Sequence, residues 1–253
     1  MTFARRIMER PQSLIPVFAL AAALLVSSGA FAQSVTVSLG EDGSFSGRVI
    51  QLILLLTVLS LAPSILIVVT SFTRIIIVLS LLRSALGTQQ TPPNVVLISL
   101  ALFLTGFIMA PTFEAVYRDA VAPLVAEEIE PDQAFDRAAG PLRAFMLKEV
   151  RHDDLQLFFD LSEVEPPTEP SATPLHVLVP AFMISELRRA FEIGFLLFVP
   201  FLVIDLVVAA ILMSMGMMML PPVMISLPFK LIFFVLVDGW HLVAGSLVRS
   251  FTG

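Results

Sequence analysis

Cysteine is absent from this chain and charged residues are scarce. Without a thiol the protein forms no disulfide, no thiolate metal site and no cysteine nucleophile. Charged residues make up 14% of the sequence, against about 25% in an average soluble domain. Hydrophobic residues make up 57%, and the mean hydropathy is +0.92. Because the apolar residues are collected in long runs, most of the chain is expected to avoid bulk water.

Several other features of common protein classes are missing. The net charge of −6 excludes the basic surface of a nucleic-acid-binding domain. There is no Gly-x-x-x-x-Gly-Lys loop, so any nucleotide energy must be supplied by another protein. The sequence has no internal repeat, which disfavours a small secondary transporter with midplane charges, an alternative that the broken apolar runs would otherwise suggest.

Catalytic and metal-binding patterns are also lacking. His176 and His241 stand alone, and His152-Asp153-Asp154 has no further ligand at helical spacing. No serine lies in a Gly-x-Ser-x-Gly context. We therefore expect no metal, no cofactor and no enzymatic activity, and an intramembrane enzyme is the weaker interpretation.

Residues 1–32 have the pattern of a cleavable signal peptide. Three arginines within the first ten residues precede a short apolar run, Leu14–Val26, and Ala30-Phe31-Ala32 has the small-x-small pattern of a cleavage site. We expect the cut between Ala32 and Gln33, which places the new N-terminus in the periplasm. The alternative is an uncleaved first transmembrane helix, which the shortness of the run and Pro16 disfavour.

The mature chain reads as three parts. A first apolar helical block covers 33–111, an acidic segment covers 112–174, and a second apolar helical block covers 175–253. Hydropathy alone predicts four membrane spans, at about 49–70, 93–111, 191–213 and 223–248. Two spans after a periplasmic N-terminus return the chain to the periplasm, so the acidic segment is expected there.

The acidic segment is predicted to be helical. It holds fourteen acids and five bases, a net charge of −9, and such a scarcity of Lys and Arg fits the outer side of a membrane. Apolar residues recur at helical spacing from Phe135 to Met146, and Asp153–Ser162 reads as a second short helix. Glu163–Pro174 has the composition of an extended, proline-rich linker. Strand-like alternation is absent.

Charged side chains interrupt the apolar runs. The most unusual are Arg74, Asp205 and Lys230, with Glu186 at the opening of a run and Asp238 near the end of another. An ionised side chain at the bilayer centre costs about 2.5–3.5 kcal/mol even on insertion scales. Some charges at span ends can instead reach the headgroups. For Glu186 and Lys230 we favour pairing inside an assembly over such snorkelling.

Prolines are spread through the same runs. Each removes a backbone donor and tends to break a helix, and broken helices at membrane depth need protein or a cavity around them. The sequence therefore predicts an all-α, membrane-associated protein of proline-broken helical hairpins with a helical periplasmic segment. The prolines concerned are Pro63, Pro180, Pro200, Pro221, Pro222 and Pro228.

Methionines gather between the last two apolar runs. Six of them lie between Met213 and Met224, where Gly216 and Pro221-Pro222 interrupt the backbone. Methionine side chains adapt to irregular space, and an apolar constriction can close a pore by excluding water. From the residues alone, a pore seal and an ordinary methionine-rich turn remain equally open.

Two stretches resemble a known family. PAFMISELRRAFEIGF (Pro180–Phe195) and LPFKLIFFVLVDGW (Leu227–Trp240) closely resemble the FliP family of flagellar export-gate proteins, whose injectisome counterparts are called SctR. The stretch Ser71–Pro111 is also similar to the family, and LRAFML (Leu142–Leu147), which contains Arg143, resembles its periplasmic helix. The likeness extends over about Leu52 to Phe251, and such long motifs are specific.

The resemblance implies a function in protein export. Family members assemble in several copies with FliQ and FliR, beside other export-apparatus membrane proteins, into an oligomeric pore in the inner membrane at the flagellar basal body. Unfolded flagellar subunits pass through it, and much of the apolar mass is held in the assembly. A signal peptide favours a flagellar member over the injectisome alternative.

The resemblance also implies roles for individual residues. Met217, Met218 and Met219 correspond to a loop that seals the pore, and Glu186 and Lys230 to charges that join subunits. Further buried or assembly charges are expected at Arg74, Asp205, Arg143 and Asp238.

Overall fold

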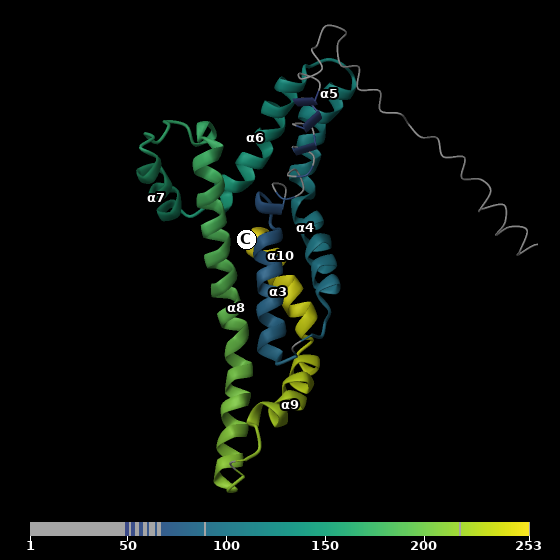
Figure 1. Ribbon diagram of the computed structural model, residues 1–253, viewed down its shortest axis with the longest axis vertical. Helices are drawn as coiled ribbons and strands as arrows, with labels where there is room; N and C mark the ends of the chain where they lie inside the picture. The colour runs from purple at the N-terminus through teal and green to yellow at the C-terminus, as the bar shows by residue number, and fades with distance from the viewer. Residues whose placement is uncertain are drawn as a thin grey trace, which may run out of the picture. The chain divides into compact units, whose positions relative to one another are not determined.

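The computed structural model describes residues 49–50, 52–53, 56–57, 60, 64, 67–88, 90–217 and 219–252. The chain divides into two compact units, Met1–Leu55 and Leu56–Gly253. The expected signal peptide, with its cleavage site at Ala32 and Gln33, lies outside the described residues, and so does Met218. All of the elements named below belong to the second unit (Figure 1).

The described residues form helices and no strands, which confirms the all-α prediction. In chain order the elements are α3 (Phe72–Leu86), α4 (Asn94–Val116), the π-helical turn η2 (Tyr117–Val121), α5 (Ala122–Val125), α6 (Pro131–Glu149), α7 (His152–Ser162), the short 3-10 helix η3 (Pro170–Ala172), α8 (Leu175–Ser214), α9 (Pro222–Leu236) and α10 (Gly239–Thr252).

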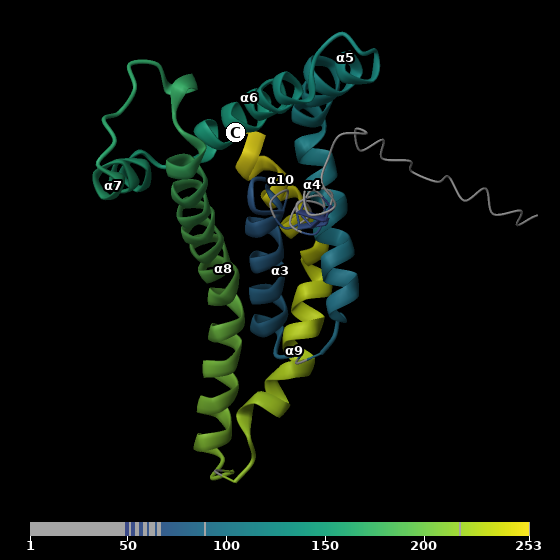
Figure 2. The same cartoon turned by 45° about the horizontal axis from the view of Figure 1, so that its top comes forward.

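Helix α3 lies at the centre of the apolar core. Ile75, Val78 and Leu82 on this helix are each at most 1% exposed. They belong to a cluster with buried side chains of α4, α8, α9 and α10, among them Phe201 and Leu247. Figures 1 and 2 show α3 flanked by α4, α8 and α10 in both views. A helix that is apolar on most of its faces is stable in such a surrounded position.

The acidic segment folds into the two helices that its sequence predicts. Helix α6 begins with Pro131 at its first turn, a position where the missing amide hydrogen costs nothing. Its apolar face ends at Met146, which is 1% exposed, whereas Phe135 at the other end is 70% exposed. Helix α7 opens with Asp153 and Asp154, whose charges suit the positive end of a helix.

Helix α8 corrects an expectation about proline. It is one helix of 40 residues that contains both Pro180 and Pro200, and α9 (Pro222–Leu236) likewise continues through Pro228. The predicted breaks at these three positions are therefore wrong. A proline removes one hydrogen bond, and helices in apolar surroundings tolerate it where neighbouring groups compensate. The expected break at Pro221-Pro222 is confirmed, since α8 ends at Ser214 and α9 begins at Pro222.

The predicted span at 223–248 is not one straight helix. Helices α9 and α10 meet at a bend of 64°, and Asp238, between them, has a left-handed φ of 50°. A β-carbon at Gly239 would lie 2.1 Å from the nearest ring carbon of Phe234. The bend therefore needs a residue without a side chain at position 239, and a proline does not produce it.

Within the described part of the chain, two helical stretches are long and apolar enough to cross a membrane. They are Asn94–Val125, which includes α4, η2 and α5, and α8 at Leu175–Ser214; the bent pair of α9 and α10 adds a third if it counts as one span. These correspond to the second, third and fourth of the four spans that hydropathy predicts. Much of the first, at 49–70, lies outside the described residues.

Candidate functional site

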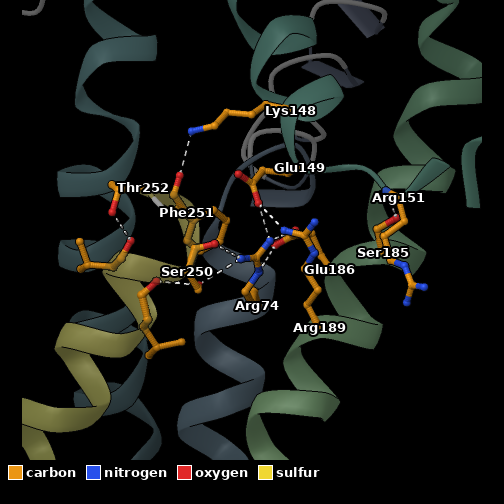
Figure 3. Close-up of polar contacts among 12 residues, drawn as sticks. Arg74, Lys148, Glu149, Arg151, Ser185, Glu186, Arg189, Ser250, Phe251 and Thr252 are labelled. Atoms are coloured by element: carbon orange, nitrogen blue, oxygen red, sulfur yellow. Dashed lines mark hydrogen bonds and ion pairs between the residues drawn. The ribbon is translucent and has the colours of Figure 1, made fainter.

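A buried charge cluster centres on Arg74. Its guanidinium donates from Nε to Oε2 of Glu186 at 2.9 Å and from Nη2 to the other oxygen of the same carboxylate. Nη2 also donates to Oε2 of Glu149 at 2.8 Å, and Arg189 donates to that same oxygen at 2.8 Å. Figure 3 shows the four side chains converging from α3, α6 and α8. Two cations and two anions balance, as burial of charge requires.

The same cluster holds the end of α10. Arg74 donates from Nη1 to the carbonyl oxygen of Ser250 at 3.0 Å, and its guanidinium carbon lies 3.6 Å from the centre of the Phe251 ring. Lys148 of α6 donates to the carbonyl oxygen of Phe251 at 3.0 Å. The last carbonyls of a helix have no partner inside it, and cations are favoured there. Residues from α3 and α6 thus cap α10 (Figure 3).

A smaller polar contact joins α7 to α8. The hydroxyl of Ser185 donates to Asp154 at 2.7 Å, and it accepts the backbone amide of Arg151 at 3.0 Å. Ser185 is 0% exposed and Asp154 is 8% exposed. Asp154 is therefore a structural partner of α8.

A second buried charge cluster lies between α3, α8 and α9. Lys230 is 3% exposed and donates from Nζ to Oδ2 of Asp205 at 2.6 Å and to the carbonyl oxygen of Ala85 at 3.1 Å. The hydroxyl of Ser226 donates to Oδ1 of Asp205 at 2.6 Å. One carboxylate of α8 therefore accepts two donors from α9. The ammonium also meets the C-terminal end of α3, where a cation is favoured.

Glu186 and Lys230 thus each have a partner within the subunit. Their pairing between subunits stays a prediction. For such pairing, Glu186 must either bind a further cation while it keeps Arg74 or separate from Arg74. In the same way, Lys230 must either bind a further anion while it keeps Asp205 or separate from Asp205.

The methionine-rich turn lies at the free ends of α8 and α9. Met217 is 44% exposed and Met219 is 97% exposed. Gly216 has a φ of +74°, a left-handed conformation that ends α8 after Ser214. Within the described part of the turn, apolar side chains face outward. This is an unusual property for a turn, and it is expected where lipid or another protein covers them.

The two remaining predicted charges differ in their surroundings. Arg143 on α6 donates to the carbonyl oxygen of Ser171 at 3.2 Å, which ties the linker to α6, and its buried Nε has no hydrogen-bond partner. The carbonyl oxygen of Asp238 accepts the amide of Leu242 at 3.1 Å, so this residue marks the start of α10. Among the described residues, no group of three or more His, Asp and Glu side chains is placed to hold a metal ion.

Sequence reasoning missed several members of both clusters. Glu149 is one of fourteen acids in the acidic segment and nothing in its spacing distinguishes it, yet it is 3% exposed. Ser226 and Ser250 carry no sequence signal beyond their place in apolar runs. A search for hydroxyls one helical turn from a charge would have found Ser226, four residues before Lys230.

A family model describes most of the chain. The model of the FliP family matches residues 55–247, a range that contains the charged side chains of both clusters and the methionine-rich turn. The chain belongs to the FliP family.

Relatives from distant bacteria carry the family's name. The flagellar biosynthetic protein FliP of Caulobacter vibrioides is 61% identical over 243 residues, which cover 96% of this chain and 91% of that protein. The flagellar biosynthetic protein FliP of Bacillus subtilis is 57% identical over 80% of this chain and 91% of its own length. That of Aquifex aeolicus is 53% identical over 80% of this chain and 85% of its own length. Each of these three FliP relatives thus matches at least 80% of this chain.

Proposed function

We propose that this chain is a pore-forming subunit of the flagellar type III protein export gate and passes unfolded flagellar subunits across the bacterial inner membrane. The observation that carries the proposal is family membership, with relatives up to 61% identical that are named flagellar biosynthetic proteins. The same names favour the flagellar gate over a virulence injectisome. The helices that are long enough to cross a membrane fit this location.

The pore is proposed to be oligomeric. Further copies of the chain, with FliQ and FliR, would surround the channel beside other export-apparatus proteins at the basal body. An exposed apolar stripe on α8 supports this, and it includes Phe195, Leu202 and Leu206. The same helix also exposes the charged side chains of Arg188 and Glu192. Such a face suits neither water nor lipid alone, because one part is apolar and the other charged.

Met217, Met218 and Met219 are proposed to seal the idle pore. The exposed side chains of the first and last support this, as does their place at the tip of a helical hairpin. The acidic segment with α6 and α7 is proposed to lie on the periplasmic side, after cleavage of residues 1–32. The chain is proposed to work as a channel, with no catalytic site or cofactor of its own.

A complementation experiment tests the function. The chain is expressed in a bacterium that lacks its own FliP-family protein, and the hook and filament proteins in the culture medium are measured together with swimming. The expected result is restored secretion and motility. Correctly inserted, abundant protein that restores neither would contradict the proposal, and restored injectisome secretion alone would favour the alternative.

A further inference from the structure

The hairpin of α8 and α9 changes its packing along its length. At one level Phe201 of α8 packs against Phe233 and Phe234 of α9, with ring centres 6.0 and 6.3 Å apart. One turn further along α8, the Asp205–Ser226–Lys230 cluster joins the two helices and ties them to Ala85 of α3. Up to this level the hairpin is part of the packed core.

From the level of the cluster towards the methionine-rich turn, an open apolar cleft runs between the two helices. It has a volume of about 420 Å³, and it is lined by Val203, Ile204, Val207, Val208, Ile211 and Leu212 of α8 and by Ile225 and Phe229 of α9. Val207, Ile211 and Phe229 are each more than 50% exposed, so the cleft is open at the surface of the subunit. Most of its lining residues lie between the polar cluster and the methionine-rich turn. Figure 2 shows that α8 and α9 continue past the end of α3 in this part of the hairpin.

From this arrangement we infer that Asp205, Ser226 and Lys230 are positioning residues that form the pivot of the hairpin. When the pore opens at the methionine-rich turn, the tip of the hairpin moves into the cleft. The inference rests on the proposed function, and it adds the moving part. Separating Lys230, which is 3% exposed, from Asp205 leaves a buried charge without its partner, whereas apolar side chains slide past one another without losing a hydrogen bond. Motion is therefore concentrated beyond the cluster.

The geometry gives this pivot a useful reach. Ser214, at the end of α8, lies nine positions after Asp205, and a rise of 1.5 Å per residue makes that arm about 14 Å long. A rotation of about 10° at the pivot moves the end of such an arm by about 2 Å. Because several copies would line one pore, a small movement in each widens the opening substantially.

The absence of cysteine allows a direct test. Val207→Cys with Ile225→Cys places one thiol on each wall of the cleft, and a short bifunctional methanethiosulfonate reagent joins them through disulfides that dithiothreitol cleaves. The assembled complex is treated in cells, and secretion is measured before treatment, after it, and after reduction. The expected result is loss of secretion on cross-linking and its return on reduction, with unchanged complex abundance.

A matched control joins α8 elsewhere. Thr73 of α3 contacts Met183 of α8, with Oγ1 and Sδ 3.9 Å apart, and Thr73→Cys with Met183→Cys ties these helices far from the cleft. Cross-linking this pair is expected to leave secretion unchanged. If the reduced cleft variant does not assemble, Val208→Cys with Phe229→Cys replaces it.

The outcomes separate the two ideas. Normal secretion through fully cross-linked Val207→Cys, Ile225→Cys protein would overturn the pivot inference and leave the proposed function intact. Secretion that persists in cells without the chain would instead refute the function. Asp205→Asn gives a second readout: a loosened pivot raises the ion conductance of the idle complex at normal abundance, whereas unchanged conductance at normal abundance contradicts the assignment.

Discussion

Arg74 and Glu186 form a bidentate ion pair in which neither side chain is exposed to solvent. They lie 112 residues apart in the sequence. Two parallel hydrogen bonds fix the relative orientation of a guanidinium and a carboxylate more tightly than a single contact does. Since Arg74 also reaches Glu149 and Ser250, one side chain connects the apolar core with the acidic segment and the last helix.

Removing the charge at Arg74 is expected to destabilise the subunit strongly. Arg74→Met leaves Glu149 and Glu186 buried with Arg189 as their remaining cation, and breaking a buried pair typically costs about 3–5 kcal/mol. The expected result is a large loss of membrane-inserted protein, measured by quantitative immunoblotting and by thermal unfolding in detergent. Arg188→Met is the control, because its partner Glu192 is 59% exposed and exposed pairs contribute about 0–1 kcal/mol. Equal stability of the two variants would contradict the central position of Arg74.

The sequence identifies the buried charges but not their partners. Arg74, Asp205 and Lys230 are recognisable because ionised groups in apolar runs are costly. No periodicity relates Arg74 to Glu186 or Asp205 to Lys230, since each pair forms only when separate helices pack together. The family resemblance directs attention to Glu186 and Lys230, which lie in different clusters within the subunit.

Helix ends show the same division between local and tertiary information. The helices α6 and α7 follow from apolar residues at helical spacing, and the turn before Pro222 follows from Gly216 and two prolines. The continuity of α8 through Pro200 depends on what surrounds the helix, which a single sequence does not encode locally. The bend at Asp238 depends on the closeness of Gly239 to Phe234.

Gly194 is expected to set how closely α3 and α8 approach. A β-carbon at this position would lie 2.3 Å from Cδ1 and 3.2 Å from Cβ of Leu81. Gly194→Ala therefore overpacks the contact, at a typical cost of about 1–3 kcal/mol. Leu81→Ala in the same chain should recover part of this loss, measured as a double-mutant cycle on unfolding. Gly140→Ala is the control: no atom lies within 4 Å of its β-carbon position, and it should be neutral or stabilising.

Two charge reversals distinguish pairing within a subunit from pairing between subunits. Lys230→Asp combined with Asp205→Lys restores the contact seen inside the chain, whereas Lys230→Glu combined with Glu186→Lys restores the predicted contact between subunits. Each single reversal should impair assembly, because it buries like charges together. Native gel analysis of the complex measures recovery. Single reversals that all assemble normally would argue against both pairings.

Cleavage of the signal peptide gives a direct chemical prediction. N-terminal sequencing of the mature protein from membranes should begin at Gln33, after the Ala30-Phe31-Ala32 pattern. Ala32→Leu is expected to retain residues 1–32, because a large side chain disrupts the small-x-small site. An intact Met1 end on assembled, functional protein would show that the segment is an uncleaved membrane anchor.

Replacing Met217, Met218 and Met219 with alanine tests the proposed seal. A pore that admits an unfolded chain would leak ions when idle unless an apolar constriction excluded water, and alanine removes most of the side-chain bulk at that point. Because Met217 and Met219 are 44% and 97% exposed, their truncation should leave the subunit core intact. Complex abundance and some secretion are therefore expected to survive, while the conductance of the idle complex rises. Met224→Ala is the control, since this side chain is 69% exposed but belongs to α9. A purely structural turn would give the opposite pattern, with poor assembly and no leak from the complexes that form.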